Sequence, residues 1–376
     1  MQEMTLQTRT IARKGLRCTG PIAFGVAIFV CSTAAPAQAQ VIPSCPKTIT
    51  RGMPMPCPCI ATSDISFRTD VTCTNADGII VRANGITIRL NGFRLQCTDP
   101  LGFGLSCQGG ADPATDPPDT GIKIDGFSFV TVTGGGAIQG FDTGVLVSGA
   151  ASHNIVIQKL NITGPDADLG VLASGGARPA TDGILVQGTS LSSAIDIFAN
   201  SVDNHLSGIR LQNAKGVEVR LNFAHDNNGG ISTFGGGEAH GIHLVDSDNN
   251  KIHNNLVVDN GVNFPDDSGI MLNGVSTVNN RVSDNNVSFS NGDGISVKGG
   301  AANNVIDDNQ ILYNTSSETL PSHTFFDLAV RDNVSTNNTF NVNNTIGQGA
   351  TPLPTFRQVT AIGNMRQIQL GVRWSF

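Results

Sequence analysis

The chain has 376 residues, with 23 Lys and Arg against 30 Asp and Glu, a formal net charge of −7. This acidic balance argues against a nucleic-acid-binding protein, because such proteins present a basic surface to the phosphates. Charged residues make up only 14% of the chain and glycine accounts for 44 residues, so the composition excludes a disordered protein and argues against a helical one. Residues 201–350 hold 27 of the 34 asparagines, and this concentration indicates an internal repeat.

Residues 1–39 have the features of a secretory signal peptide. Arg13, Lys14 and Arg17 form a positive region, an apolar stretch follows, and a small-x-small cleavage pattern ends at Ala39. The apolar stretch is shorter than the ~20 residues that a membrane-spanning helix needs. We therefore predict an exported chain, secreted or periplasmic, with no membrane span. The mature chain keeps 19 basic and 29 acidic residues, a net charge of −10.

Six cysteines remain in the mature chain. An even number of cysteines in an exported protein favours disulfides, but six cysteines allow 15 pairings and their spacing does not choose among them. A metal site through Cys57-Pro58-Cys59 is the rival interpretation, although no second such pair and no histidine lies nearby. We predict a Cys-rich N-terminal cap over residues 40–75. The disulfide candidates are Cys45, Cys57, Cys59, Cys73, Cys97 and Cys107.

Two short blocks alternate between residues 76 and 345. One is Gly-apolar-x-apolar, as in Gly208-Ile-Arg-Leu, and the other is apolar-x-apolar-x-x-Asn, as in Val217-x-Val219-x-x-Asn222. Apolar and polar residues alternate over only three to five positions, which predicts short β-strands. Strands this short bury a face only by stacking on their neighbours, so the pattern predicts an all-β solenoid with three short strands per coil.

The recurrent asparagine has a structural interpretation. Between two short strands it is expected to occupy a tight bend in the left-handed conformation, which Asn tolerates better than most residues. Stacked coils would align these side chains into a ladder of hydrogen-bonded amides, because a buried polar group must be satisfied. The expected members are Asn200, Asn222, Asn255, Asn285, Asn309 and Asn337.

These blocks resemble the coils of right-handed parallel β-helix proteins. The resemblance is to pectate-lyase-like coils, and more closely to exported bacterial β-helix repeat proteins, including NosD-type and carbohydrate-binding relatives. The segment that begins at Gly85-Ile-Thr-Ile resembles the first coils of such proteins. The resemblance implies the fold and, together with the crossover rule, its right hand, but it is a poor guide to function.

The outward positions of the Gly-apolar strands form the candidate functional surface. Alternation places Ile209 inside and Arg210 outside, and coils about 4.8 Å apart make Arg210 and His243 neighbours. Insertions just before these strands are expected to form the walls of a groove. The insertions are 163–182, 225–240, 258–268 and 312–326. The candidate substrate-binding residues are Gln187, Gln212, His240, Asn273 and Lys298.

Lyase and hydrolase chemistry are both compatible with this surface. A polysaccharide lyase needs a base and a cation, which Arg210 or His243 with Ca²⁺ on Asp266 and Asp267 would supply. A hydrolase needs two carboxylates across one glycosidic bond, for which Asp267 and Asp293 on consecutive coils are candidates. We therefore predict an exported protein that binds or processes a polysaccharide or cell-envelope glycan, with lyase, hydrolase and epimerase chemistry left open.

Departures from the family's motifs keep two other functions open. Pectin-hydrolysing members carry Asn-Thr-Asp, Asp-Asp, Gly-His-Gly and Arg-Ile-Lys in that order, whereas this chain has Ala239-His240-Gly241 before Asp266-Asp267. The Asp-Pro-His-Asp signature of mannuronan epimerases is absent. A non-catalytic, adhesin-like binding module is thus the alternative. NosD-type metal delivery is the third function, but only His240 and His243 are expected to be neighbours.

Residues 346–376 form a C-terminal tail or cap strand. Apolar residues alternate with polar ones from Gln367 to Phe376, which resembles the final strand of outer-membrane barrel proteins and makes outer-membrane association a possible role. One strand cannot close a barrel. Because a solenoid needs its apolar end covered, we favour a cap over the last coil.

Overall fold

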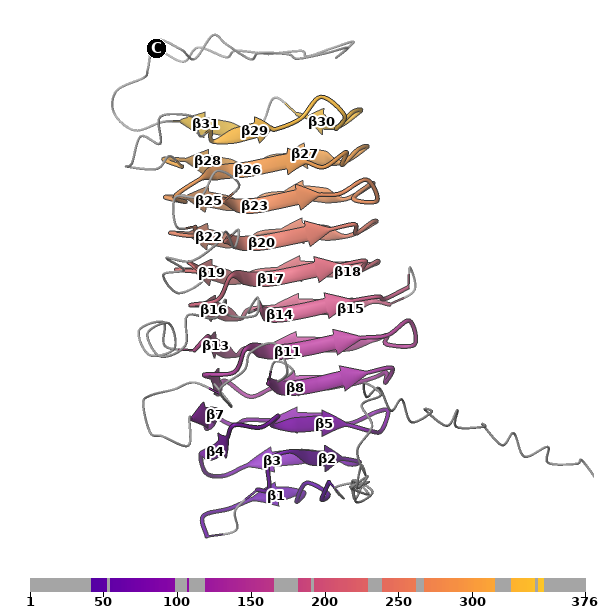
Figure 1. Cartoon of the computed structure of the whole chain (residues 1–376), viewed down its shortest axis with the longest axis vertical. Coiled ribbons are helices and arrows are strands. Elements are labelled where there is room, and N and C mark those ends of the chain that lie inside the picture. The colour runs from indigo at the N-terminus through magenta and orange to yellow at the C-terminus, as the bar shows by residue number, and fades with distance from the viewer. Residues whose placement is uncertain are drawn as a thin grey trace, which may run out of the picture. The chain divides into compact units, whose positions relative to one another are not determined.

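The described part of the chain is a solenoid of short parallel strands. The computed structural model describes residues 42–52, 55–98, 107, 119–165, 182–190, 193–228, 239–261, 267–314, 326–341 and 344–347. Its 31 strands stack coil upon coil in three parallel sheets, and the described residues contain no helix (Figure 1). No helix long and apolar enough to cross a membrane occurs among them. The prediction of an all-β, right-handed parallel β-helix is confirmed.

Each coil contributes one strand to each sheet, named here in chain order. Sheet A contains β2 (Cys59–Ala61), β5 (Ile79–Val81), β8 (Thr120–Asp125), β11 (Thr143–Ser148), β14 (Asp182–Gln187), β17 (Ser207–Gln212), β20 (His240–Val245), β23 (Ser268–Asn273), β26 (Asp293–Lys298) and β29 (Leu328–Val330). Sheet B contains β1 (Thr48–Ile49), β3 (Ile65–Phe67), β6 (Thr87–Arg89), β9 (Thr131–Thr133), β12 (Ile155–Gln158), β15 (Ile195–Phe198), β18 (Val217–Arg220), β21 (Lys251–His253), β24 (Arg281–Ser283), β27 (Val305–Asp307) and β30 (Thr339–Phe340). Sheet C contains β4 (Val71–Thr74), β7 (Arg94–Thr98), β10 (Ala137–Gln139), β13 (Asn161–Thr163), β16 (Ser201–Asp203), β19 (Phe223–His225), β22 (Leu256–Val258), β25 (Asn286–Ser288), β28 (Gln310–Leu312) and β31 (Thr345–Gly347).

The register places one residue of every coil in each row. On sheet A, Ile209 pairs with Ile242 and Arg210 with His243, so the Gly-apolar blocks are aligned. The inward side chains Ile209 and Leu211 are fully buried and pack in one continuous core with those of the other two sheets. The outward parity expected for Arg210 is confirmed.

A ladder of asparagine amides follows the bend between sheets B and C. Asn222 Nδ2 and the Asn222 backbone N–H both donate to Asn255 Oδ1, at 3.1 and 3.0 Å, and each coil repeats this pair of bonds. Asn222 Nδ2 also donates to the Ile197 carbonyl of the preceding coil. The members are Asn200, Asn222, Asn255, Asn285, Asn309 and Asn344.

Two details of the expected ladder are wrong. The last member is Asn344 and not Asn337. In addition, the left-handed residue is the one before the ladder asparagine, as at Leu221 and Asn254, where φ is +54° and +53°. Two residues thus form the bend: the first turns the chain, and the second points inward and bonds the backbone of the neighbouring coils.

The other two bends carry ladders that the sequence analysis missed. Between sheets A and B the amides bond in the same way, and the members are Asn250, Asn280, Asn304 and Asn338. Between sheets C and A, Asn227 Nδ2 donates to Asn260 Oδ1 (2.9 Å) and Asn314 Nδ2 to Asp327 Oδ1 (3.2 Å). Left-handed residues precede these members too, as at Asn249.

His205 occupies the first position of this third ladder, where its backbone N–H donates to Asn227 Oδ1. The equivalent position in the preceding coil is Pro165, which has no N–H to donate, so no amide is needed at His205 to accept from it. His205 is fully buried. Burial lowers the pKa of His205 to about 3, although a hydrogen bond with the Asp203 backbone opposes the shift.

All six cysteines of the mature chain form disulfides, which fits an oxidising compartment. The pairs are Cys45–Cys59, Cys57–Cys73 and Cys97–Cys107. A metal site through Cys57 and Cys59 is therefore ruled out, since both sulfur atoms are bonded elsewhere. The strands β1 to β4 of the expected cap already belong to the three sheets. Residues 1–39, predicted to be a signal peptide, and the tail after Gly347 lie outside the described residues.

Asn255→Ala should destabilise the solenoid strongly. The change removes the acceptor of the Asn222 N–H and a donor to the Val219 carbonyl, and each buried group left without a partner costs about 1–3 kcal/mol. We expect urea unfolding to show a loss of roughly 3 kcal/mol or more. Asn286→Ala, at the exposed position directly after the ladder residue Asn285, is the matched control and should change stability by less than about 0.5 kcal/mol. Equal losses in both variants would contradict a structural role for the ladder.

Protonation of His205 should make the fold acid-sensitive. Its folded pKa of about 3 lies below the ordinary value of 6.5, so the unfolded chain binds the extra proton and stability falls as the pH drops from 6.5 towards 3. At pH 4.5 the loss from this residue is about 2–3 kcal/mol. Urea unfolding of His205→Gln should show a flatter pH dependence than the parent. Parallel pH profiles of the two proteins would disprove a contribution of His205 to the acid sensitivity.

Candidate functional site

The outer face of sheet A carries three rows of side chains at fixed positions of the Gly-apolar block. The glycine of each block allows close approach of the next coil: a Cβ at Gly241 would lie 2.5 Å from Val257 Cγ1 and 2.8 Å from the Gly269 carbonyl oxygen. The row before the glycine is polar throughout and buried. Its members are Thr120, Thr143, Asp182, Ser207, His240, Ser268 and Asp293.

Asp182, Arg210 and His243 form the charged centre of this face, on the consecutive strands β14, β17 and β20. Arg210 Nη1 lies 3.9 Å from Asp182 Oδ2, and Arg210 pairs directly with His243 in the register. Asp182 and His243 are almost fully buried, whereas the Arg210 side chain keeps 23% of its surface exposed. Arg210 and His243 are thus neighbours on adjacent strands, as expected.

Each residue of this centre has one buried polar atom without a hydrogen-bond partner. The atoms are Asp182 Oδ1, Arg210 Nε and His243 Nε2. An unsatisfied buried group costs about 1–3 kcal/mol, and each such group in a native structure calls for an explanation. A polar ligand that accepts from Arg210 and bonds His243 and Asp182 would satisfy all three.

The electrostatics of the centre favour a neutral imidazole beside a permanent cation. Burial holds the pKa of His243 well below its usual value, and the electrostatic effect of His240 and the positive charges of Arg210 and Lys298 act in the same direction. Burial raises the pKa of Asp182 to about 6, although Arg210 and a hydrogen bond from Ser207 oppose the rise. At neutral pH His243 is therefore a free base and Arg210 is charged.

His240 and Ser268 support His243 from the buried row. Ser268 Oγ lies 3.1 Å from His240 Nδ1, and the His240 and His243 rings meet edge to face with centroids 4.3 Å apart. The pair of neighbouring imidazoles expected from the sequence is therefore present. His253 lies on sheet B, where its Nε2 is 2.8 Å from Glu218 Oε1, so it takes no part in the centre.

Both acids expected to act on the substrate are committed to contacts within the protein. The fully buried Asp267 accepts the Ala239 N–H at Oδ1 (2.8 Å). Asp293 accepts two hydrogen bonds from the Arg331 guanidinium, one of them 2.6 Å long, and burial still raises its pKa. Asp266, the other expected Ca²⁺ ligand, lies outside the described residues.

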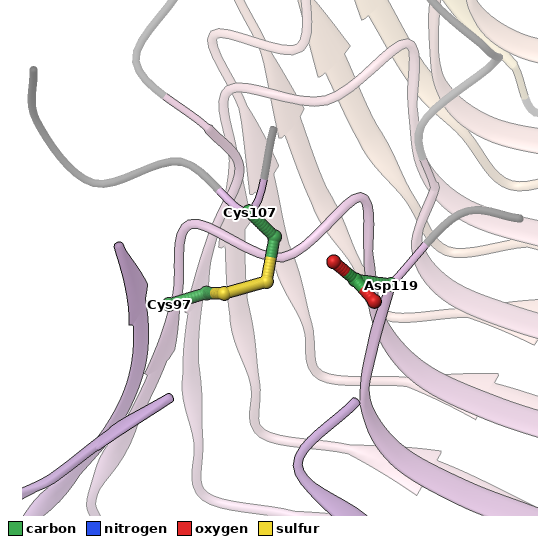
Figure 2. A group of neighbouring side chains, drawn as sticks. All are labelled: Cys97, Cys107 and Asp119. Atoms are coloured by element: carbon green, nitrogen blue, oxygen red, sulfur yellow. A yellow bond between two sulfur atoms is a disulfide. The ribbon is translucent and has the colours of Figure 1, made fainter. Parts of the chain in front are cut away.

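The described residues hold one group of three potential metal ligands within 4.8 Å: Cys97, Cys107 and Asp119. Figure 2 shows that the two sulfur atoms of this group are joined in the disulfide, with the Asp119 carboxylate beside it. Thiolates are the ligands that bind such a metal, and a disulfide offers none. Among the described residues, no such group of three includes Asp267.

The other expected substrate-binding residues lie in the row along the far end of each sheet A strand. These half-buried residues, one per coil, are Gln187, Gln212, Asn273 and Lys298. The sequence analysis missed Asp182, Ser207 and Ser268. Their signal was the position directly before each glycine, which is polar in block after block.

Comparison with known proteins identifies the fold family. Three solved structures align with this chain. A mutant of the periplasmic alginate epimerase AlgG is 12% identical, with 77% of this chain and 76% of that chain covered and a TM-score of 0.41. The Dettilon tailspike protein gp208 is 18% identical, with 77% and 61% covered and a TM-score of 0.37. The GH136 lacto-N-biosidase from Eubacterium ramulus is 13% identical, with 77% and 48% covered and a TM-score of 0.39.

No curated relative matches the chain. The family described as the right-handed β-helix region matches residues 77–316, more than half of the chain, and the same residues form most of the stacked coils described above. The chain belongs to the right-handed β-helix family.

Proposed function

We propose that the protein binds a polysaccharide along the outer face of sheet A and removes a proton from it at the Arg210–His243 pair, as a lyase or an epimerase does. The observation that carries the proposal is the set of unpartnered atoms on Asp182, Arg210 and His243, which lie on three consecutive strands. The rows repeat at about 4.8 Å, so this face offers similar contacts many times over, as a linear polymer requires.

The chemistry of the pair suits proton abstraction next to a carboxylate. The neutral His243 is able to accept the proton, and Arg210 is able to stabilise the negative charge that develops on the sugar carboxylate. The row formed by Gln187, Gln212, Asn273 and Lys298 would orient the sugar hydroxyls. Asp267 accepts the Ala239 N–H, so this proposal does not include Ca²⁺. A Ca²⁺ site at Asp266 and Asp267 stays a separate prediction.

Hydrolysis is supported less well. A glycoside hydrolase places its two carboxyl groups within about 10 Å of each other. Asp182 and Asp293 are the two acids of the buried row, and they stand four strands apart, about 19 Å at the usual strand spacing. One glycosidic bond does not span that separation.

The proposed place of action is outside the cytoplasm. The signal peptide expected over residues 1–39 and the three disulfides support secretion or a periplasmic location. The mature charge of −10 disfavours strongly anionic polymers unless a cation accompanies them.

A panel of acidic and neutral polysaccharides, with and without Ca²⁺, tests the proposal. We expect the parent protein to release products that absorb as unsaturated sugars or to change uronate configuration, and His243→Gln and Arg210→Gln to lower kcat/KM by at least about 100-fold. Lys251→Gln, on sheet B, is the control and should keep full activity. Binding without turnover by the parent would instead favour the non-catalytic module, and reducing ends without unsaturation would favour a hydrolase.

The pKa of His243 should rise when a positive charge near it is removed. Lys298 is one of the charges that lower it, so Lys298→Gln should raise the pKa of His243. Because the base works only when deprotonated, the acid limb of kcat/KM should then move to higher pH. Titration of the His243 imidazole by NMR measures the same shift without any substrate. An unchanged titration in Lys298→Gln would contradict this electrostatic picture.

A further inference from the structure

Sheet C exposes large apolar side chains on four consecutive coils. Leu221, Phe223, Leu256, Phe289 and Tyr313 expose 56, 38, 40, 52 and 45% of their surfaces. Leu221 lies in the bend between β18 and β19, and the others lie on or directly after β19, β22, β25 and β28, which are neighbours in the sheet. We call these five residues the sheet C patch. Exposed apolar side chains gathered on one sheet mark a place that something else covers.

Two of the three aromatic members of the patch stand where the backbone disfavours them. Phe289 and Tyr313 have φ of +57° and +60°, at the position that Asp226 and Asp259 occupy in the two preceding coils. Asp tolerates the left-handed conformation, whereas a bulky side chain rarely adopts it. The Phe289 and Tyr313 rings stack outside the core with centroids 5.3 Å apart. Neither ring is needed to fill the core, so their position points to a surface role.

The corner beside the patch is acidic. Burial raises the pKa of Asp203 and Asp259 and the charge of Asp226 adds to both rises, whereas His225, whose Nδ1 lies 2.8 Å from Asp226 Oδ2, opposes them. No Lys or Arg occurs in β16, β19, β22, β25 or β28. A partner for this surface therefore combines an apolar face with positive charge.

The tail after Gly347 has that chemistry. Its 29 residues contain three arginines and no Asp or Glu. From Gln367 to Phe376, apolar and polar residues alternate, which is typical of a strand with one apolar face. The apolar positions are Ile368, Leu370, Val372, Trp374 and Phe376.

The last described strand places the start of the tail close to the patch. β31 belongs to sheet C and pairs with β28, so the patch begins on the neighbouring strand. From β31 to β19 is four strand spacings, about 19 Å. The 19 residues between Gly347 and Gln367 span up to about 60 Å when extended, so the segment 367–376 is able to reach every residue of the patch.

We propose that residues 367–376 pack across the sheet C patch, with their apolar face on Phe223, Leu256, Phe289 and Tyr313 and Arg373 near the acidic corner. This contact puts the tail on the side of the solenoid, whereas a cap would cover its last coil. The tail residues lie outside the described part of the chain, so the contact rests on the surface that they would cover, on the reach of the chain and on the complementary charge.

The chain contains a built-in pair of probes for this contact. Its single tyrosine, Tyr313, lies on the patch, and its single tryptophan, Trp374, lies in the tail. In the full chain we expect excitation of Tyr313 to give Trp374 emission by energy transfer, together with a blue-shifted Trp374 spectrum. Trp374→Phe provides the donor alone and Tyr313→Phe the acceptor alone.

Two variants that keep both probes test the surfaces. Phe289→Ser with Leu256→Ser on the patch, or Leu370→Ser with Val372→Ser on the tail, should reduce the transfer several-fold and shift Trp374 emission to the red. Val275→Ser, at a 75% exposed residue between sheets A and B, is the control and should leave both signals unchanged. Circular dichroism of each variant reports whether the solenoid remains folded.

Two outcomes would overturn the proposal. One is solvent-like Trp374 emission without transfer in the folded full chain, which would leave the tail free or turned towards another surface. The other is transfer that disappears on dilution, or that appears on mixing Trp374→Phe with Tyr313→Phe, because the tail would then cover a second copy of the chain. Transfer that is independent of concentration and weakened by added salt supports the contact within one chain.

Discussion

The structure depends on the hydrogen bond from a backbone N–H of one coil to a buried asparagine side chain of the next. A bend buried between short strands leaves N–H and carbonyl groups that no sheet can pair, and water does not reach them. Asn222 resolves this by accepting from the coil on one side while its own amide group donates to both neighbouring coils. The left-handed residue before it turns the chain sharply enough for the amide to point inward.

This constraint also sets the geometry of the candidate site. Because the bends hold every coil at the same rotation, each sheet A strand begins at the same place, and the residue before each glycine falls in one row. Arg210 and His243 meet since their coils are in register, although 33 residues separate them in the sequence. The site is thus a consequence of stacking, and a slip of one residue in any bend would separate its members.

Much of the fold could be predicted from the sequence, and the reasons are local. Period-two alternation in Gly208-Ile-Arg-Leu gives the strand and the outward side of Arg210, and the spacing of Asn222 and Asn255 gives one ladder. The other ladders were missed although their spacing is as regular, since Asn250 stands five residues before Asn255 and Asn227 five residues after Asn222. The roles of Asp267 and Asp293 could not be predicted, since burial by neighbouring coils decides whether a carboxylate faces substrate or holds a backbone N–H.

Different bonds stabilise different parts of the solenoid, and Pro165, where the third ladder ends, marks one of the boundaries. On one side of Pro165 the described coils from Asn200 onward are joined by amide ladders, and at the other end the residues up to Cys107 carry the three disulfides. The described strands β8 to β13 between them contain neither a disulfide nor a ladder amide of their own, and Asn200 is the ladder member that bonds their last coil, at Ile157 and Leu160. When the chain is pulled from both ends, these coils should therefore unfold first and leave two blocks that each unfold as a unit.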